Sequence, residues 1–183
     1  MPESLYEIPL RRIDGTPASL ADYRGHVLLI VNVASNCGLT SQYAALEGLY
    51  QEKRRKGFEV LGFPANNFLR QEPGSDSEIA EFCSNEYDVH FPLFSKISVL
   101  GVDQHPLYTK LTAARPAAIG DGTFRVILRG YGINADSTLD VLWNFEKFLL
   151  SRRGEVVARF APDVDPNDPR LIVAIDSELA KNS

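Results

Sequence analysis

Cys37 is the side chain in this sequence best placed to do chemistry. It lies where an apolar, β-branched run ending at Ala34 gives way to a helical pattern that starts at Gly38 or Leu39. At such a turn the first backbone N–H groups of a helix have no partner, and the helix end carries partial positive charge. Thiolates at helix N-termini have lowered pKa values and raised reactivity. The alternative is a buried structural cysteine, because free cysteine is among the most buried residue types. Position alone leaves both interpretations open.

Few other side chains could join Cys37 in a site built on cysteine or histidine. Cys83 is the second of the two cysteines, and the sequence has no Cys-x-x-Cys pair. The three histidines, His26, His90 and His105, are scattered along the chain and lack zinc-ligand spacing. We therefore expect neither a metal site nor a bound cofactor. In a reducing cytosol a pair of thiols tends to be transient, and to serve catalysis or redox sensing.

Length and composition are those of an ordinary globular protein that forms one domain over residues 1–183. The formal net charge of −5 argues against a nucleic-acid binder, which usually carries a basic patch. Residues 1–6 lack the basic and apolar regions of a signal peptide. The longest apolar run, residues 27–31, is too short to span a bilayer. We expect a soluble, cytoplasmic protein with no nucleic-acid partner and no stable membrane insertion.

Two strands and the helix between them are expected to position Cys37. Residues 26–34 form a continuous apolar run, typical of a strand that is buried on both faces of a parallel sheet. Residues 39–56 have helical spacing, with a basic last turn before Gly57. A second strand is expected at residues 58–63. This order predicts parallel strands, so Cys37 and the loop after the second strand should share the carboxyl edge of the sheet, where ligand sites form.

Further elements are predicted on both sides of this unit. Ser75 and Glu78 form a capping-box pattern that opens a short helix through about Tyr87, and this helix contains Cys83. Apolar spacing over residues 124–131 favours a helix, with a strand as the alternative. The other expected elements are a small hairpin at 5–24, an apolar docking segment at 91–94, a helix at 106–113, a hairpin formed by 141–150 and 155–161, and a last helix that starts at 165–166.

The order of these elements is that of the thioredoxin-like fold, and over residues 5–180 the chain closely resembles the glutathione peroxidase family. Any one of the shared stretches would be a weak signal, but all of them occur in order along one chain. The stretches are NVASNCG at 32–38, GFPANNF at 62–68, QEPG at 71–74, FPLFSKI at 91–97, HPLY at 105–108, WNFEKF at 143–148 and VARF at 157–160.

The resemblance implies an α/β protein with a central mixed β-sheet flanked by helices and an N-terminal β-hairpin. It also implies a peroxidase whose nucleophile is Cys37, from the NVASNCG stretch. The QEPG stretch places Gln71 in the family's catalytic set, and WNF adds Trp143 and Asn144. Taken alone, Gln71 would be an ordinary loop residue and Trp143 a core residue. Their types suit the reaction, because amide and indole N–H groups can stabilise a thiolate and a departing oxygen without a second titratable group.

Cys83 stands where thioredoxin-dependent members of the family carry a resolving cysteine. A core cysteine on a helix is the alternative. Peroxide oxidises a thiolate to a sulfenic acid, which condenses with a second thiol to a disulfide. A disulfide needs Cα atoms within about 7 Å of each other. We therefore expect residues 77–87 to unwind when Cys83 reaches Cys37, since a short helix has little intrinsic stability.

The expected function is reduction of hydrogen peroxide and of organic or lipid hydroperoxides, an antioxidant activity in the response to oxidative stress. Cys83 would resolve the oxidised Cys37, and thioredoxin would reduce the disulfide. One alternative is a glutathione-dependent peroxidase without a resolving cysteine. Another is a peroxide sensor or redox relay, which would use the same residues. A thioredoxin-fold binding protein would keep Cys37 inert.

Two other enzyme classes are disfavoured by the residues around Cys37. A peroxiredoxin would carry Pro and Thr shortly before the nucleophile, and this chain has Val-Ala-Ser-Asn. A disulfide oxidoreductase would need a second sulfur, which Cys37-Gly-Leu-Thr40 lacks. Many relatives have cysteine in place of Ala65 and glutamine in place of Asn67. Residues 114–140 are where the family varies most, so oligomeric state and peroxide preference do not transfer through them.

Overall fold

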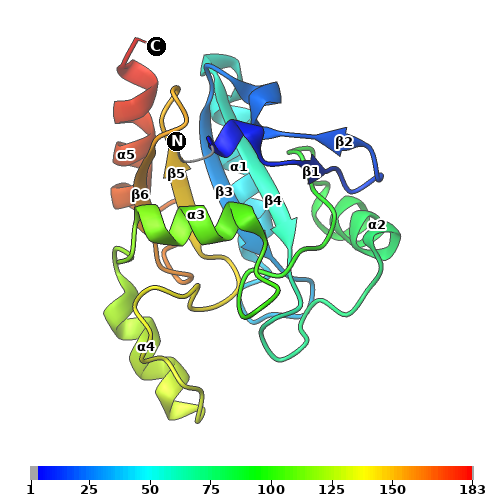
Figure 1. Ribbon diagram of the computed structural model, residues 1–183, viewed down its shortest axis with the longest axis vertical. Coiled ribbons are helices and arrows are strands. Elements are labelled where there is room, and N and C mark those ends of the chain that lie inside the picture. Colours follow the sequence, from blue (N-terminus) through cyan, green and yellow to red (C-terminus); the bar gives the residue numbers. More distant parts are fainter. Residues whose placement is uncertain (1–3, 183) are drawn as a thin grey trace.

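A four-stranded mixed sheet forms the centre of the computed structural model, which describes residues 4–182 (Figure 1). The strands lie in the order β4-β3-β5-β6. They are β3 (Val27–Val33), β4 (Phe58–Pro64), β5 (Lys147–Leu150) and β6 (Val156–Phe160). Strand β3 pairs in parallel with β4 and antiparallel to β5. The carboxyl ends of β3 and β4 therefore share one edge of the sheet, as the βαβ pattern predicts, and the antiparallel pairing of β5 places its start at the same edge.

Strand β3 lies at the centre because both of its faces are apolar. Successive side chains of a strand point to opposite faces of the sheet. Leu28 and Ile30 accordingly pack into one core, and Leu29 and Val31 pack into the other. Asn32 is the exception, a polar side chain that is fully buried in this apolar strand.

Helices cover both faces of the sheet. The face of Leu29 is covered by α1 (Gln42–Lys53) and α5 (Pro169–Ala180), and the face of Ile30 by α3 (Pro106–Ala114), in front of the sheet in Figure 1. Helix α2 (Asp76–Tyr87) contacts α1 and begins with the predicted capping box. Helix α4 (Asp121–Gly130) projects at the lower left in Figure 1, which settles the choice between helix and strand for this segment.

The N-terminal hairpin is confirmed and is very short. Strands β1 (Leu10–Arg11) and β2 (Pro17–Ala18) pair antiparallel, with one 3₁₀-helix before them at Leu5–Glu7 and one after them at Leu20–Tyr23. The apolar segment at 91–94 docks between this hairpin and the main sheet. Leu93 bridges to Gly62, and Phe94 bridges to Arg12.

Three predicted boundaries are wrong, and two of them lie at the candidate site. Helix α1 begins at Gln42 and not at residues 38–39, because hydrogen bonds of Thr40 first close a turn that contains Cys37. Strand β5 begins at Lys147 and not at residue 141, because Phe145 has a left-handed backbone with φ of 69°. Helix α5 begins at Pro169 and not at residues 165–166, and Asp168 caps it.

The helices of residues 4–182 include none with the length and apolar character needed to cross a membrane.

Candidate active site

Cys37 lies in the loop that joins β3 to α1, and it is partly exposed. Its Sγ accepts a hydrogen bond from the backbone N–H of Leu39 at 3.3 Å. Its own N–H donates to the Thr40 hydroxyl at 2.9 Å, and that hydroxyl donates to the Ala34 carbonyl at 2.8 Å. The donor that faces the sulfur is therefore an amide of a tight turn. The expected N-terminus of a helix is displaced to Gln42.

Gln71 is fastened to the loop of Cys37. Its carbonyl accepts a hydrogen bond from the N–H of Asn36 at 3.0 Å, which places the QEPG loop beside the nucleophile. The chain enters this loop through two residues with left-handed backbone, Leu69 (φ 51°) and Arg70 (φ 54°). The amide of Gln71 then meets Asn144, whose Nδ2 donates to Gln71 Oε1 at 2.9 Å. This pair is 73 positions apart in the sequence.

Trp143 closes the other side of the site. Its ring packs on Phe68 with 5.0 Å between ring centroids, and its side chain is almost fully buried. Its carbonyl accepts a hydrogen bond from Asn32 Nδ2 at 3.0 Å. Asn32 is not among the site residues expected from the sequence, and it anchors the backbone of Trp143. An amide inside an otherwise apolar strand was the available signal, since buried polar groups need partners.

Cys37, Gln71 and Trp143 line one pocket of about 770 Å³. The rest of its lining is mostly apolar and comes largely from α4 and the residues after it. These residues are Gly38, Leu39, Leu69, Phe124, Ile127, Leu128, Tyr131, Gly132, Ile133 and Asp163. Residues 114–140, the part of the chain in which the family varies most, therefore supply one wall of the pocket that contains Cys37.

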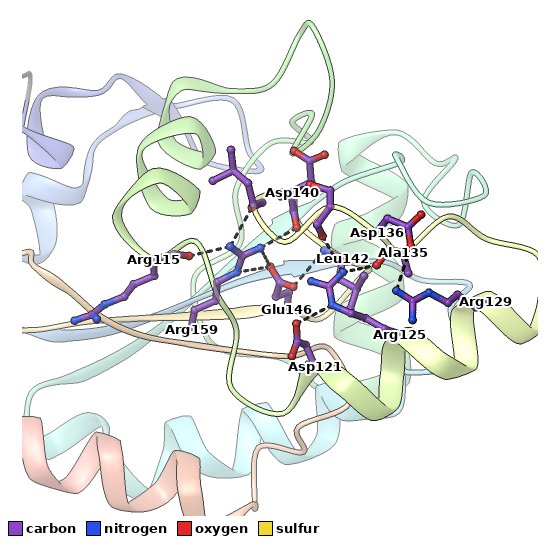
Figure 2. Close-up of polar contacts among 12 residues, drawn as sticks. Arg115, Asp121, Arg125, Arg129, Ala135, Asp136, Asp140, Leu142, Glu146 and Arg159 are labelled. Atoms are coloured by element: carbon purple, nitrogen blue, oxygen red, sulfur yellow. Dashed lines mark hydrogen bonds and ion pairs between the residues drawn. The ribbon is translucent and has the colours of Figure 1, made fainter.

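A polar network holds this wall and the loop before Trp143 (Figure 2). Arg125 of α4 pairs with Asp121 and donates to the carbonyl of Ala135.

Arg159 of β6 forms a fully buried ion pair with Glu146, at 2.8 Å between Nη2 and Oε2. Arg159 also donates to the carbonyls of Arg115, Leu139 and Asp140, and the Glu146 carboxylate accepts the N–H of Leu142. The irregular backbone up to Trp143 thus has defined partners.

Cys83 is placed apart from the candidate site. It lies inside α2, is buried among apolar side chains, and does not line the pocket of Cys37. Burial raises the pKa of the Cys83 thiol to about 11, and the nearby Glu72 carboxylate adds to this rise. The nearby Tyr43 hydroxyl acts in the opposite direction. Both cysteines are free thiols.

The two positions at which the sequence departs from many relatives are also located. Ala65 is buried in the core beside β4. Asn67 holds the loop at 98–100, because its Nδ2 donates to the Ser98 hydroxyl at 3.0 Å and its Oδ1 accepts the N–H of Val99 at 2.9 Å. Its amide therefore has a structural task outside the pocket of Cys37.

The arrangement provides one thiol, one carboxamide and one indole at an apolar cavity, and the Asn144 carboxamide is hydrogen-bonded to that of Gln71. In residues 4–182, no group of three or more His, Cys, Asp or Glu side chains could hold a metal ion. A partly exposed sulfur that faces a backbone N–H is suited to act as a thiolate nucleophile. The fold and the site together are those of a thiol-dependent oxidoreductase.

Solved structures of similar fold support this class. A structure described as the apo form of Trgpx has a TM-score of 0.73 at 30% identity, covering 100% of this chain and 99% of that one. T. cruzi GPX1 has a TM-score of 0.69 at 34% identity, covering 97% of each chain. A thioredoxin family protein from Chlorobium tepidum has a TM-score of 0.61 at 14% identity, covering 98% of each chain, and this shows likeness of fold alone. The predicted thioredoxin-like fold is confirmed.

Sequence comparison then gives the family. The family model described as Glutathione peroxidase matches residues 5–112. The Thioredoxin/glutathione peroxidase BtuE of Escherichia coli K12 is 48% identical over 183 residues, which are 99% of this chain and 100% of the relative. The Hydroperoxy fatty acid reductase gpx1 of Synechocystis is 44% identical over 90% of each chain. The chain belongs to the glutathione peroxidase family, and it is a thiol peroxidase, as the sequence motifs predicted.

Proposed function

We propose that this protein, acting as a single domain over residues 1–183, reduces hydroperoxides through a Cys37 thiolate, with Gln71, Trp143 and Asn144 completing the catalytic set. The observation that carries this proposal is that these residues, which are far apart in the sequence, lie together in the structure. Cys37, Gln71 and Trp143 line one pocket, and Asn144 donates to Gln71 at 2.9 Å. Residues from three separate loops thus meet at the edge of the sheet where β3 and β4 end.

In the first step the Cys37 thiolate attacks the outer oxygen of the peroxide. An S–O bond forms and the O–O bond breaks, so the sulfur is oxidised to a sulfenic acid and the peroxide is reduced. The departing oxygen leaves as alkoxide or hydroxide and takes up a proton from solvent. The N–H groups of Gln71 and Trp143 stabilise the charge on the attacking sulfur and on the departing oxygen.

In the second step the Cys83 thiol condenses with the sulfenic acid, forming the Cys37–Cys83 disulfide and releasing water. A buried thiol with a pKa of about 11 is protonated and unreactive inside the intact helix. Helix α2 must therefore open before Cys83 can attack. A small pocket of about 190 Å³ lies between the loop at Ser35-Asn36 and the α2 residues Ile79 and Phe82. This unfilled space supports movement of α2 toward Cys37.

The reductant of the disulfide is proposed to be thioredoxin, with glutathione as the alternative. The name of the Escherichia coli relative includes both. The two thiols of thioredoxin would be oxidised to a disulfide of their own. The Cys37–Cys83 disulfide would break, and both cysteines would return to the thiol form. This cycle is proposed to run in a reducing cytoplasm, where thiols are kept reduced.

The proposed substrates include hydroperoxides with an apolar body as well as hydrogen peroxide. The pocket at Cys37 is walled by apolar side chains such as Phe124, Ile127 and Leu128. The Synechocystis relative is named as a reductase of hydroperoxy fatty acids. Apolar surface removed from water on binding would favour such molecules.

The decisive experiment is peroxide consumption by the purified protein with a single reductant. Thioredoxin with its reductase is compared with glutathione, using wild type and Cys83→Ser. The proposal predicts turnover with thioredoxin and little with glutathione. Cys83→Ser should lose thioredoxin-supported turnover and still be oxidised once by peroxide. Turnover with glutathione that survives Cys83→Ser would assign the glutathione-dependent mechanism. Activity with neither reductant would contradict the cycle.

A further inference from the structure

The backbone that presents Trp143 and Asn144 is held in an unfavourable conformation. Phe145, the next residue, has φ of 69° and is fully buried. A non-glycine residue in the left-handed region is uncommon, and it persists only when the surrounding structure enforces it. The contacts of this turn should therefore reveal which side chains enforce it.

Lys147 makes the contact on one side of the turn. It is the first residue of β5, and its side chain is fully buried. Its Nζ donates to the carbonyl of Phe145 at 2.6 Å and to the carbonyl of Pro162 at 3.0 Å. The carbonyl of Pro162 also accepts from Gln42 Nε2 at 2.8 Å, which ties the lysine to α1.

Asn32 makes the contacts on the other side. Its Nδ2 donates to the carbonyl of Trp143, and its own carbonyl accepts the N–H of Phe145 at 2.6 Å. The two peptide groups that flank Asn144 are thus anchored to β3, and the carbonyl after them is anchored to Lys147. Asn144 projects from this clamped turn to Gln71.

Packing alone does not account for a lysine at this position. Burying an ammonium group carries a large desolvation penalty, and an apolar side chain of similar length would fill the space without it. Burial lowers the pKa of Lys147 to about 7 even though the carboxylates of Glu146, Asp163 and Asp165 favour its charged form. The two hydrogen bonds to backbone carbonyls are what an apolar side chain could not supply.

We infer that Lys147 is a positioning residue for peroxide reduction: its Nζ holds the Phe145 carbonyl, and through it the turn that presents Trp143 to the pocket of Cys37 and Asn144 to Gln71. This inference rests on the proposed function for the roles of Trp143 and Asn144. Its structural part, the hold of Lys147 on the turn, can be measured independently of any activity.

The test compares three variants with wild type. Lys147→Met keeps the length of the side chain and removes the donor. Lys147→Gln keeps N–H donors without the charge. Lys53→Met is the matched control, because Lys53 is also a buried lysine, paired with Asp176 at 2.7 Å at the end of α1 away from the turn. Trp143 is the only tryptophan in the chain, so its fluorescence reports on the turn directly.

Three measurements are made on each protein: the tryptophan emission of the reduced enzyme, hydrogen peroxide consumption in a single turnover, and the rate at which dithiothreitol reduces the oxidised enzyme. Lys147→Met should shift the emission to longer wavelength and lower the rate constant with peroxide by about 100-fold, the scale of an ångström-sized misplacement. Lys147→Gln should lie between Lys147→Met and wild type. Reduction by dithiothreitol should be unchanged, and Lys53→Met should match wild type in all three.

Equal peroxide rates and equal emission in Lys147→Met and wild type would overturn the inference. Equal loss in the peroxide and dithiothreitol steps would also overturn it, because that result indicates a general structural role. If Lys147→Met does not fold, the same comparisons are made with Lys147→Gln. If wild type itself consumes no peroxide, the proposed function fails, and the emission of the variants still decides whether Lys147 holds the turn.

Discussion

At the scale of single residues, the two cysteines have the same side chain but lie in different environments. Cys37 is partly exposed, and its Sγ accepts a hydrogen bond from the N–H of Leu39. Cys83 is buried, and the pKa of its thiol is raised to about 11. Only a thiolate is an effective nucleophile. In the reduced protein one sulfur, that of Cys37, is therefore accessible, and the other, that of Cys83, is buried and protonated.

This difference predicts selective alkylation. Iodoacetamide at about pH 8 should modify Cys37 in the reduced native protein and leave Cys83 intact, because the Cys83 thiol is both inaccessible and protonated. Peptide mass mapping reports the modified site. In urea both cysteines should react, which is the control for reagent access. Modification of Cys83 at the same rate as Cys37 in the native protein would contradict the buried placement.

At the scale of elements, α2 and α4 are the two segments on which the proposed mechanism depends. In the proposed cycle α2 has to open, and its N-terminus is held by a capping box in which the Ser75 hydroxyl accepts a hydrogen bond from the N–H of Glu78. Helix α4 has to stay in place, because it walls the pocket, and Arg125 fastens it to the loop at 135–137. The two helices thus have opposite requirements for stability.

Weakening the cap of α2 should speed disulfide formation. Ser75→Ala removes the hydroxyl that caps α2, which costs about 1 kcal/mol of helix stability. If opening of α2 limits the second step, the rate of disulfide formation after one equivalent of peroxide should rise about fivefold, measured by quenched-flow thiol trapping. The matched control is Ser41→Ala, since Ser41 precedes α1 and makes no side-chain cap. A rate that does not change in Ser75→Ala would contradict opening of α2 as the slow event.

Polar substitution on the pocket side of α4 should act on bulky substrates alone. Ile127 lines the pocket, and Val126 beside it is exposed and does not. Ile127→Ser should lower kcat/KM for cumene hydroperoxide about fivefold, the effect of losing roughly 1 kcal/mol of apolar contact, and leave hydrogen peroxide unaffected. Val126→Ser should change neither value. Steady-state kinetics with both peroxides makes the comparison, and equal loss for the two peroxides would exclude a role in binding the apolar body.

At the scale of the whole molecule, the buried amino group of Lys147 makes the free energy of unfolding depend on pH. Lys147 has a folded pKa of about 7 and an ordinary value of 10.5. Between these values the unfolded chain binds one more proton than the folded protein at this group. The free energy of unfolding contributed by Lys147 therefore rises with pH through this window, and the penalty for burying its charge is fully present below about pH 7.

Denaturation experiments check this sign. The free energy of unfolding of wild type, relative to Lys147→Met, should rise between about pH 7 and pH 9 by up to about 1.4 kcal/mol per pH unit. Urea titrations of both proteins at each pH give the difference, in which the titrating groups that do not interact with Lys147 cancel. The same slope in the two proteins would show that Lys147 does not change its protonation on unfolding in this range.

The sequence by itself determined what depends on near neighbours. The apolar run of β3, the capping box of Ser75 and Glu78, and the stop at Gly57 of the 3₁₀-helix that follows α1 (Arg54–Lys56) depend on residues within a few positions of each other. The family motifs added Cys37, Gln71, Trp143 and Asn144 as candidates, and the family itself is confirmed. Local geometry suffices for the elements, whereas the site residues came from the resemblance to the family.

Only the tertiary structure decided the contacts between distant segments. The hydrogen bond from Asn144 to Gln71, the hold of Asn32 and Lys147 on the turn at Phe145, and the start of α1 at Gln42 depend on where the sheet and its loops pack. A left-handed Phe145 is unfavourable locally, and long-range hydrogen bonds stabilise it. Local preference is worth little beside such buried contacts, which is why local pattern extended β5 too far and began α1 too early.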